Sequence, residues 1–298
     1  MRNYKYISLL FIATIIMGAE FPIIKIGLKT VPPLFFIAIR FLFAFFILFI
    51  IYINHVRNVL KKDIIIPSFI LSIFLFAGFL TANFGIKYTT ATNSGFYISL
   101  VVLFTPILEW VFFKKSISKR IFLCVVISLV GIFLISTDSL SMNFNYGDLL
   151  CLISALFYSL QIIFTALYVK RHNPLIISLF QIGFVSILGI FSSCFLETLP
   201  KISSIGLYGW LSLTFTGVVA TAVVYTIQSF AQTEVSPSNI GIIYSHEPVF
   251  AAILSYIMLG ERIGLKGMIG GIFIVFSAII YNILPSNTND DCIEVESI

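Results

Sequence analysis

The ionisable side chains inside the long apolar stretches of this 298-residue chain include Glu20, Arg40, His246 and Glu247. A charged group at the centre of a membrane helix costs about 2.5–3.5 kcal/mol on insertion scales, so such residues are functional candidates by default. The chemistry open to them is binding of a charged compound and exchange of protons. The alternative is a structural ion pair, or a side chain that reaches the interface.

Glu20 and Arg40 are expected at similar depth in the first and second apolar stretches. They could pair with each other across the two helices. They could equally hold the opposite ends of a zwitterionic substrate, and both interpretations stay open. Lys25 lies nearer the end of the first stretch, and we expect its amino group to extend to the interface.

His246-Glu247-Pro248 falls near the middle of the ninth apolar stretch. Proline cannot donate its backbone hydrogen bond, so it loosens a helix locally, and such a helix usually faces protein or a water-filled cavity. His246 is either a neutral buried histidine bonded to a neighbour or a proton carrier. Glu247 is expected to support the bend, and it is also a candidate for binding substrate or protons.

Three further residues are candidates for lining a path: Tyr97, Gln228 and Tyr244. The same applies to a wider set of polar and aromatic side chains, which includes Gln161, Tyr158, Tyr225, Trp110 and Tyr256. Interhelical hydrogen bonds for the amides and interfacial anchoring for the aromatics are the alternatives.

The composition indicates which kind of helix carries these residues. The chain is 59% hydrophobic and only 10% charged, whereas a globular chain carries roughly 25% charged residues. Stretches of about 20 apolar residues are the signature of transmembrane helices. We therefore predict an all-α integral membrane protein with ten spans, at about 6–27, 32–53, 64–86, 91–113, 119–137, 147–169, 174–196, 204–230, 237–259 and 264–284.

Several classes of function are disfavoured by the same sequence. The net charge of +5 does not indicate nucleic-acid binding, because the Lys and Arg residues lie in short loops. The cysteines show no disulfide framework, and the chain has no C-x-x-C, H-E-x-x-H or G-x-x-x-x-G-K-[ST] motif. We expect no catalytic residues, metal or cofactor, and no ATP-driven pump.

Two windows 146 residues apart share seven identities without a gap. They are Asn93, Gly95, Ser99, Phe104, Ile107, Leu108 and Ile117 in the first, and Asn239, Gly241, Ser245, Phe250, Ile253, Leu254 and Ile263 in the second. We predict two five-helix repeats, 1–143 and 144–285, followed by an acidic disordered tail, 286–298. An odd number of spans per repeat inverts the second repeat in the membrane, an arrangement that supports alternating access.

The prolines of the two windows do not align. Pro106 aligns with Ala252, and Pro248 aligns with Val102. Both prolines are predicted helix bends, so the bend is expected to shift by one helical turn between the halves.

The loop charges predict the orientation. With a cytoplasmic N-terminus, eleven Lys and Arg residues face the inside and six face the outside. Positive residues are enriched in cytoplasmic loops, so both termini are predicted to be cytoplasmic.

Three motifs, in order, give the chain a family resemblance. Met17-Gly18-x-x-Phe21-x-x-x-Lys25 is similar to W-G-x-x-F-x-x-x-K, and the run from Tyr88 to Pro106 is similar to Y-T-S-A-G-N-A-G-F-L-T-G-L-Y-V-V-F-T-P. The third comprises Ser238-Asn239, Glu247-Pro248-Val-Phe-Ala and Leu259-Gly260-Glu261-Arg262. The chain thus resembles the EamA-type members of the drug/metabolite transporter superfamily. It departs from them at Met17, in place of Trp, and at Lys114-Lys115, in place of Gly-Glu.

The resemblance implies a secondary transporter of amino acids, amines, nucleotide-like metabolites or drugs, often an exporter in a bacterial inner membrane. We expect export of small metabolites such as amino acids, with protons as a possible coupling ion. Transport of drugs, amines or nucleotide-like compounds by the same fold is the alternative, and a membrane scaffold or sensor is the alternative of a different class. Gly267-x-x-x-Gly271 fits helix packing within the bundle or across a homodimer.

Overall fold

The computed structural model describes residues 2–56, 62–114, 117–139, 145–261 and 264–283. This part of the chain folds into helices joined by short connections, without a strand. The elements of the first half are α1 (Arg2–Gly27), α2 (Pro33–Val56), α3 (Lys62–Tyr88), α4 (Ala91–Ile98), α5 (Val101–Phe113) and α6 (Lys119–Ser139). The predicted tail, 286–298, lies outside the described residues.

The second half begins with α7 (Tyr146–Val169) and α8 (Pro174–Leu196), followed by the short η1 (Ile202–Ser204). One long segment is formed by α9 (Gly206–Thr214), the π-helix η2 (Phe215–Val223) and α10 (Val224–Ala231). The remaining helices are α11 (Pro237–Tyr244), α12 (Glu247–Leu259) and α13 (Leu265–Ile283).

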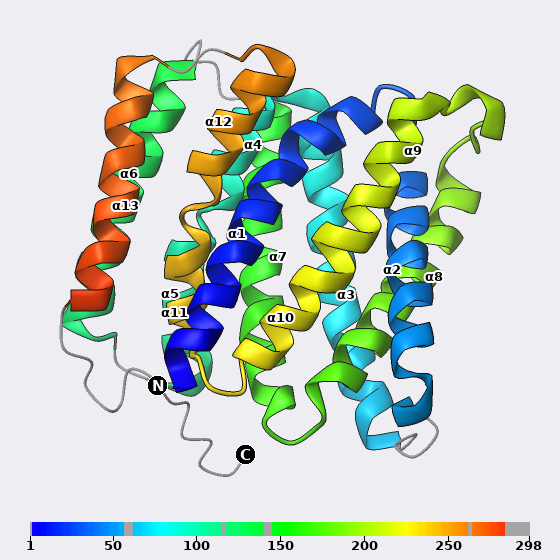
Figure 1. Ribbon diagram of the computed structural model, residues 1–298, viewed down its shortest axis with the longest axis horizontal. Helices are drawn as coiled ribbons and strands as arrows, with labels where there is room; N and C mark the ends of the chain where they lie inside the picture. Colours follow the sequence, from blue (N-terminus) through cyan, green and yellow to red (C-terminus); the bar gives the residue numbers. More distant parts are fainter. Residues whose placement is uncertain (1, 57–61, 115–116, 140–144, 262–263, 284–298) are drawn as a thin grey trace.

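Eight segments are long and apolar enough to cross a membrane, and Leu265–Ser277 is a shorter apolar helix. Each of the eight corresponds to a predicted span. The predicted fifth and tenth spans coincide with α6 and α13, which pack side by side at one edge of the bundle (Figure 1). Helix α1 begins and α13 ends at the same end of the bundle (Figure 1).

Two of the membrane-length segments are broken in the middle, at equivalent positions. The first break separates α4 from α5 at Ser99, and the second separates α11 from α12 at Ser245. The serines have nearly the same backbone angles, φ −66° and ψ −10° for Ser99 and φ −61° and ψ −12° for Ser245. Ser99 and Ser245 also align with each other in the internal repeat, where they form one of the seven identical pairs.

The expected shift of the bend between the halves is therefore wrong. Pro248 lies at the start of α12, where a missing N–H is tolerated, so it fits the break beside it. Pro106 lies inside α5, several residues beyond the break at Ser99. The first break forms without a proline, so a proline does not mark its position.

The broken segments are fastened at their ends by carboxylates from the opposite half. Glu109 of α5 accepts from the backbone N–H of Ser238 at 3.2 Å and from its hydroxyl, at the start of α11. Glu261, just after α12, accepts from the backbone N–H groups of Ala91 and Thr92 at 3.1 and 3.0 Å, at the start of α4. Negative charge at a helix N-terminus satisfies unpaired N–H groups and the helix dipole.

Helix α1 crosses the centre of the bundle between α12 and α10 (Figure 1). Gly18 allows this close approach, because a Cβ at that position would lie 2.4 Å from Cβ of Phe250. At its far end, Lys25 donates to the carbonyl of Ile86 at 2.6 Å and to that of Thr89. The amino group thus caps the end of α3.

Candidate functional site

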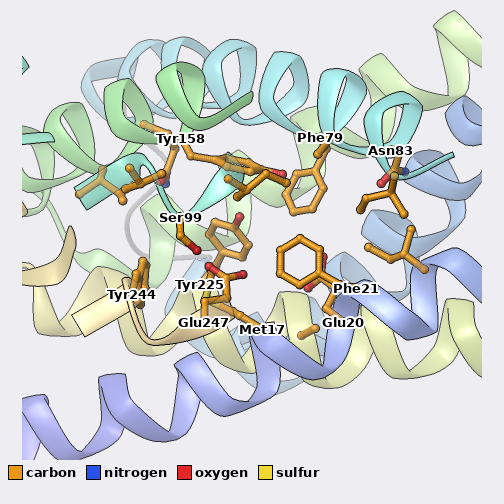
Figure 2. Close-up of a pocket in the computed structure, with 18 of the residues that line it drawn as sticks. Met17, Glu20, Phe21, Phe79, Asn83, Ser99, Tyr158, Tyr225, Tyr244 and Glu247 are labelled. Atoms are coloured by element: carbon orange, nitrogen blue, oxygen red, sulfur yellow. The ribbon is translucent and has the colours of Figure 1, made fainter. Parts of the chain in front are cut away.

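A cavity lies at the centre of the bundle, where α1 faces α3 and α7 (Figure 2). Its volume is about 40 Å³, which is room for a few water molecules. Its polar and ionisable lining residues are Glu20, Asn83, Ser99, Tyr158, Gln161, Tyr225, Gln228, Tyr244 and Glu247. Phe21, Phe79, Met17 and small aliphatic residues complete the wall.

Glu20 and Arg40 form an ion pair beside this cavity. Nη1 and Nη2 of Arg40 donate to the two carboxylate oxygens of Glu20 at 2.5 and 2.9 Å. The Arg40 side chain is fully buried and its Nε donates to the hydroxyl of Thr221 at 2.7 Å. Its guanidinium also lies 4.3 Å from the ring centroid of Phe79. Glu20 lines the cavity whereas Arg40 stands behind it, so the pair supports the wall.

Thr221 is placed for this contact by the π-helix η2. Its hydroxyl donates at 2.7 Å to the carbonyl of Thr216, five residues earlier, which is the spacing of a π turn. The same oxygen accepts from Arg40. The π-helix therefore holds the third partner of the buried charge pair.

Gln228 and Tyr244 belong to a chain of hydrogen bonds at the same cavity. The Tyr244 hydroxyl donates to Oε1 of Gln228 at 3.2 Å, and Nε2 of Gln228 donates to Oε1 of Gln161 at 2.9 Å. Gln161 in turn donates to Thr165 at 2.9 Å. The two predicted residues thus meet, and they fix α7, α10 and α11 around the cavity.

Glu247 lies at the first position of α12 and lines the cavity with only 5% of its surface exposed. Figure 2 shows Glu247 and Glu20 among the side chains around the same space. The structure therefore brings Glu20, Gln228, Tyr244 and Glu247 together at one cavity.

His246 and Tyr97 do not line this cavity. Nδ1 of His246 lies 2.9 Å from the carbonyl oxygen of Ile243, and its ring packs edge-on against Phe11. Tyr97 packs against Phe96, with ring centroids 4.4 Å apart. The histidine geometry favours the structural interpretation of the two that the sequence left open.

Phe21 and Phe79 are cavity residues that the sequence did not single out. Phenylalanine is frequent throughout the chain, with 32 residues, so no feature of composition separates the two from those facing lipid. Phe21 had one signal, since it belongs to the motif that begins at Met17. Trp110 and Tyr256, by contrast, are 53% and 58% exposed and do not line the cavity.

Within the described residues, no group of three or more His, Cys, Asp or Glu could hold a metal ion. A bundle of membrane-length helices around a buried, partly polar cavity is the architecture of a multi-pass integral membrane protein. The model of the EamA-like transporter family matches residues 4–137 and again residues 145–283. The chain therefore belongs to the EamA-like transporter family, within the drug/metabolite transporter superfamily.

The relatives are themselves transporters without a stated substrate. An uncharacterized transporter of Archaeoglobus fulgidus is 30% identical, over 95% of this chain and 87% of the relative. The uncharacterized transporter YdfC of Bacillus subtilis is 25% identical, over 87% and 84% of the two chains. A solved crystal structure with 12% identity superposes with a TM-score of 0.73 over 92% of this chain and 95% of the other, which shows the likeness of the fold.

Proposed function

We propose that the protein is a secondary transporter that exports small metabolites, such as amino acids or related compounds, across a bacterial cytoplasmic membrane. The central cavity is the observation that carries this proposal. It is lined by Glu20 and Phe79 from the first half and by Gln228 and Glu247 from the second. A substrate path between the two halves of a repeated fold is typical of secondary transporters.

Alternating access by two inverted five-helix repeats is the proposed mechanism. It is supported by the double match of the family model and by the breaks at Ser99 and Ser245. The caps formed by Glu109 and Glu261 join the halves at opposite ends of the broken segments. Either end can then open when its cap is released, while the other end stays closed. With α6 and α13 as further spans, the bundle has ten.

The proposed orientation places both termini in the cytoplasm. It rests on the excess of Lys and Arg in the predicted inner loops. The Glu109 cap then lies at the cytoplasmic end, and the Glu261 cap lies at the outer end.

A growth screen tests whether the protein transports metabolites. A strain that overproduces the protein is expected to resist toxic amino-acid analogues or amines that inhibit the parent strain. Purified protein in proteoliposomes is then expected to move the protecting compound, and faster when a pH gradient is imposed. Glu20→Gln serves as the comparison where the purified variant is still folded at the assay temperature, because it should then abolish flux if Glu20 is required at the cavity.

Absence of both resistance and flux across a broad panel of metabolites would contradict transport. The chain would then be better described as a membrane scaffold or sensor. Flux that is unaffected by a pH gradient would contradict proton coupling alone.

A further inference from the structure

Glu247 differs from the other buried acidic side chains of this protein. Its carboxylate lies in the cavity wall, and none of the described residues forms a hydrogen bond or an ion pair with it. In Figure 2 its carboxyl group is turned into the cavity that Ser99 and Tyr225 also line. It is therefore a buried acceptor that faces a space rather than a partner.

Five other acidic side chains of the bundle have partners that account for them. Glu20 pairs with Arg40, and Asp148 accepts from Thr89 at 2.6 Å and from the backbone of Asn145 at 2.9 Å. The remaining three accept from backbone N–H groups at helix starts: Glu109 from Ser238, Glu197 from Leu34 and Phe35, and Glu261 from Ala91 and Thr92. This contrast identifies Glu247 as the acidic group that the fold leaves for a ligand.

The charges around the cavity do not balance when Glu247 is ionised. No Lys, Arg or His side chain is among the described residues that line it. Arg40 pairs with the cavity residue Glu20, and both of its terminal nitrogens are engaged there. An ionised carboxylate in such surroundings is costly unless a positive charge accompanies it. Glu247 must therefore hold either a proton or a cation.

The rest of the wall suits a cation that carries N–H groups. Tyr158 and Tyr225 line the cavity, and neither hydroxyl has a hydrogen-bond partner among the described residues. Phenol oxygens accept hydrogen bonds from an ammonium group, and aromatic faces attract cations. An anionic ligand would instead meet two carboxylates, Glu20 and Glu247.

We propose that Glu247 binds the protonated amino group of the transported compound, and binds a proton after that compound has left. This inference rests on the proposed transport function and names its substrate class. Arrival of an ammonium group releases one proton from the Glu247 carboxyl group, and departure allows one proton to return. One positive charge thus occupies the site in either state, which makes the exchange an antiport of amine and proton.

The other titratable groups near Glu247 do not provide this exchange. Glu20 and Lys25 come from α1, and both are engaged, with Arg40 and with the carbonyls at the end of α3. The tyrosines, which are Tyr97 on α4, Tyr158, Tyr225 and Tyr244, ordinarily titrate at about pH 10. His246 lies on the adjacent backbone position but does not line the cavity.

Proton release on binding tests the inference directly. Four compounds that share a benzyl group and differ in their charged groups serve as probes: phenethylamine, phenylalanine, phenylacetate and 2-phenylethanol. Purified full-length protein in weakly buffered detergent solution, with a pH indicator dye, is expected to release close to one proton per protein on addition of phenethylamine. Phenylacetate and 2-phenylethanol should release none.

The variants then assign the proton to one residue. Glu247→Gln should abolish proton release and weaken phenethylamine binding at least about tenfold, since a buried charge pair is lost. Glu247→Asp retains a carboxyl group, and it should release a proton even if its affinity is lower. His246→Gln, at the neighbouring position, should release the same number of protons as the wild type.

Several outcomes would overturn the inference. One is proton release that persists in Glu247→Gln, and another is binding of phenylacetate in preference to phenethylamine. Binding of none of the four probes by the wild type would also overturn it. Transport itself is judged separately by the growth screen and by metabolite flux, so the amine inference can fail while the transport proposal stands.

Discussion

Arg40 carries a fully buried charge, and the stability of the fold around it depends on Glu20. The guanidinium is fully buried and bonded to Glu20 and Thr221. Removing one partner of a buried pair leaves an uncompensated charge, whereas replacing both partners by neutral groups is often tolerated.

Glu20→Gln is therefore predicted to destabilise the protein by about 3–5 kcal/mol. The double variant Glu20→Gln with Arg40→Met should lose less stability than Glu20→Gln alone. Thermal unfolding of the purified protein in detergent measures both. A double variant that is less stable than the single variant would contradict the assignment of the pair as a buried structural unit.

At the same scale, the sequence identified the ionisable residues and offered a Glu20–Arg40 pair as one of two interpretations, but it could not decide between them. Intramembrane charge is costly, so Glu20, Arg40 and Glu247 stand out in an apolar chain. The partner of Arg40 depends on how α1 and α2 meet, and its third contact depends on a π-helix that begins at Phe215. Neither feature has a local sequence signal. Phe21 and Phe79 were missed for the same reason, because side-chain facing is decided by packing.

At the scale of the element, the ends of the two broken segments are equivalent but differ in residue type. Lys114 ends α5 with φ +54°, and Gly260 ends α12 with φ +70°. Glycine adopts this left-handed conformation at no steric cost, whereas another residue is strained there. The departure from the family motif at Lys114 thus has a structural cost.

Lys114→Gly is predicted to stabilise the protein by about 0.5–1 kcal/mol, after the entropy cost of glycine is subtracted. Gly260→Lys is the matched change at the equivalent position, and it should destabilise by about 1–2 kcal/mol. The apparent melting temperatures should therefore move in opposite directions. If both substitutions changed the melting temperature by the same amount and in the same direction, the left-handed backbone angles would not determine the stability of these helix ends.

The length of the apolar stretches predicted the helical elements well, because a backbone in lipid must satisfy its own hydrogen bonds and forms helices to do so. The eight candidate spans begin and end within a few residues of the predicted ones. The breaks were not predicted correctly. Proline was used as the marker, yet the break at Ser99 has none, and Pro106 lies within α5.

At the scale of the whole molecule, the two carboxylate caps make a prediction about access to the cavity. Ser99 lines the cavity and is 2% exposed, so a reagent can reach it only when one end of the bundle opens. The caps formed by Glu109 and Glu261 hold opposite ends.

A Ser99→Cys reporter, with the four native cysteines replaced by serine, tests this prediction. Adding Glu261→Ala should increase labelling by an impermeant thiol reagent from the outer side. Adding Glu109→Ala should increase labelling from the cytoplasmic side. Increased labelling from the same side in both variants would contradict alternating access by these ends.

The π-helix η2 affects which side chains before and after it face the cavity. Ala220, Tyr225 and Gln228 all line the cavity. In a regular α-helix, residues five positions apart point about 140° away from each other, at 100° per residue. The wider π turn brings Tyr225 round to the side of Ala220. A π turn holds about one residue more than an α turn, so the π-helix keeps Tyr225 and Gln228 on the cavity side despite the extra residue. The number of residues in this segment, rather than their identity, thus determines which side chains of the helix face the cavity.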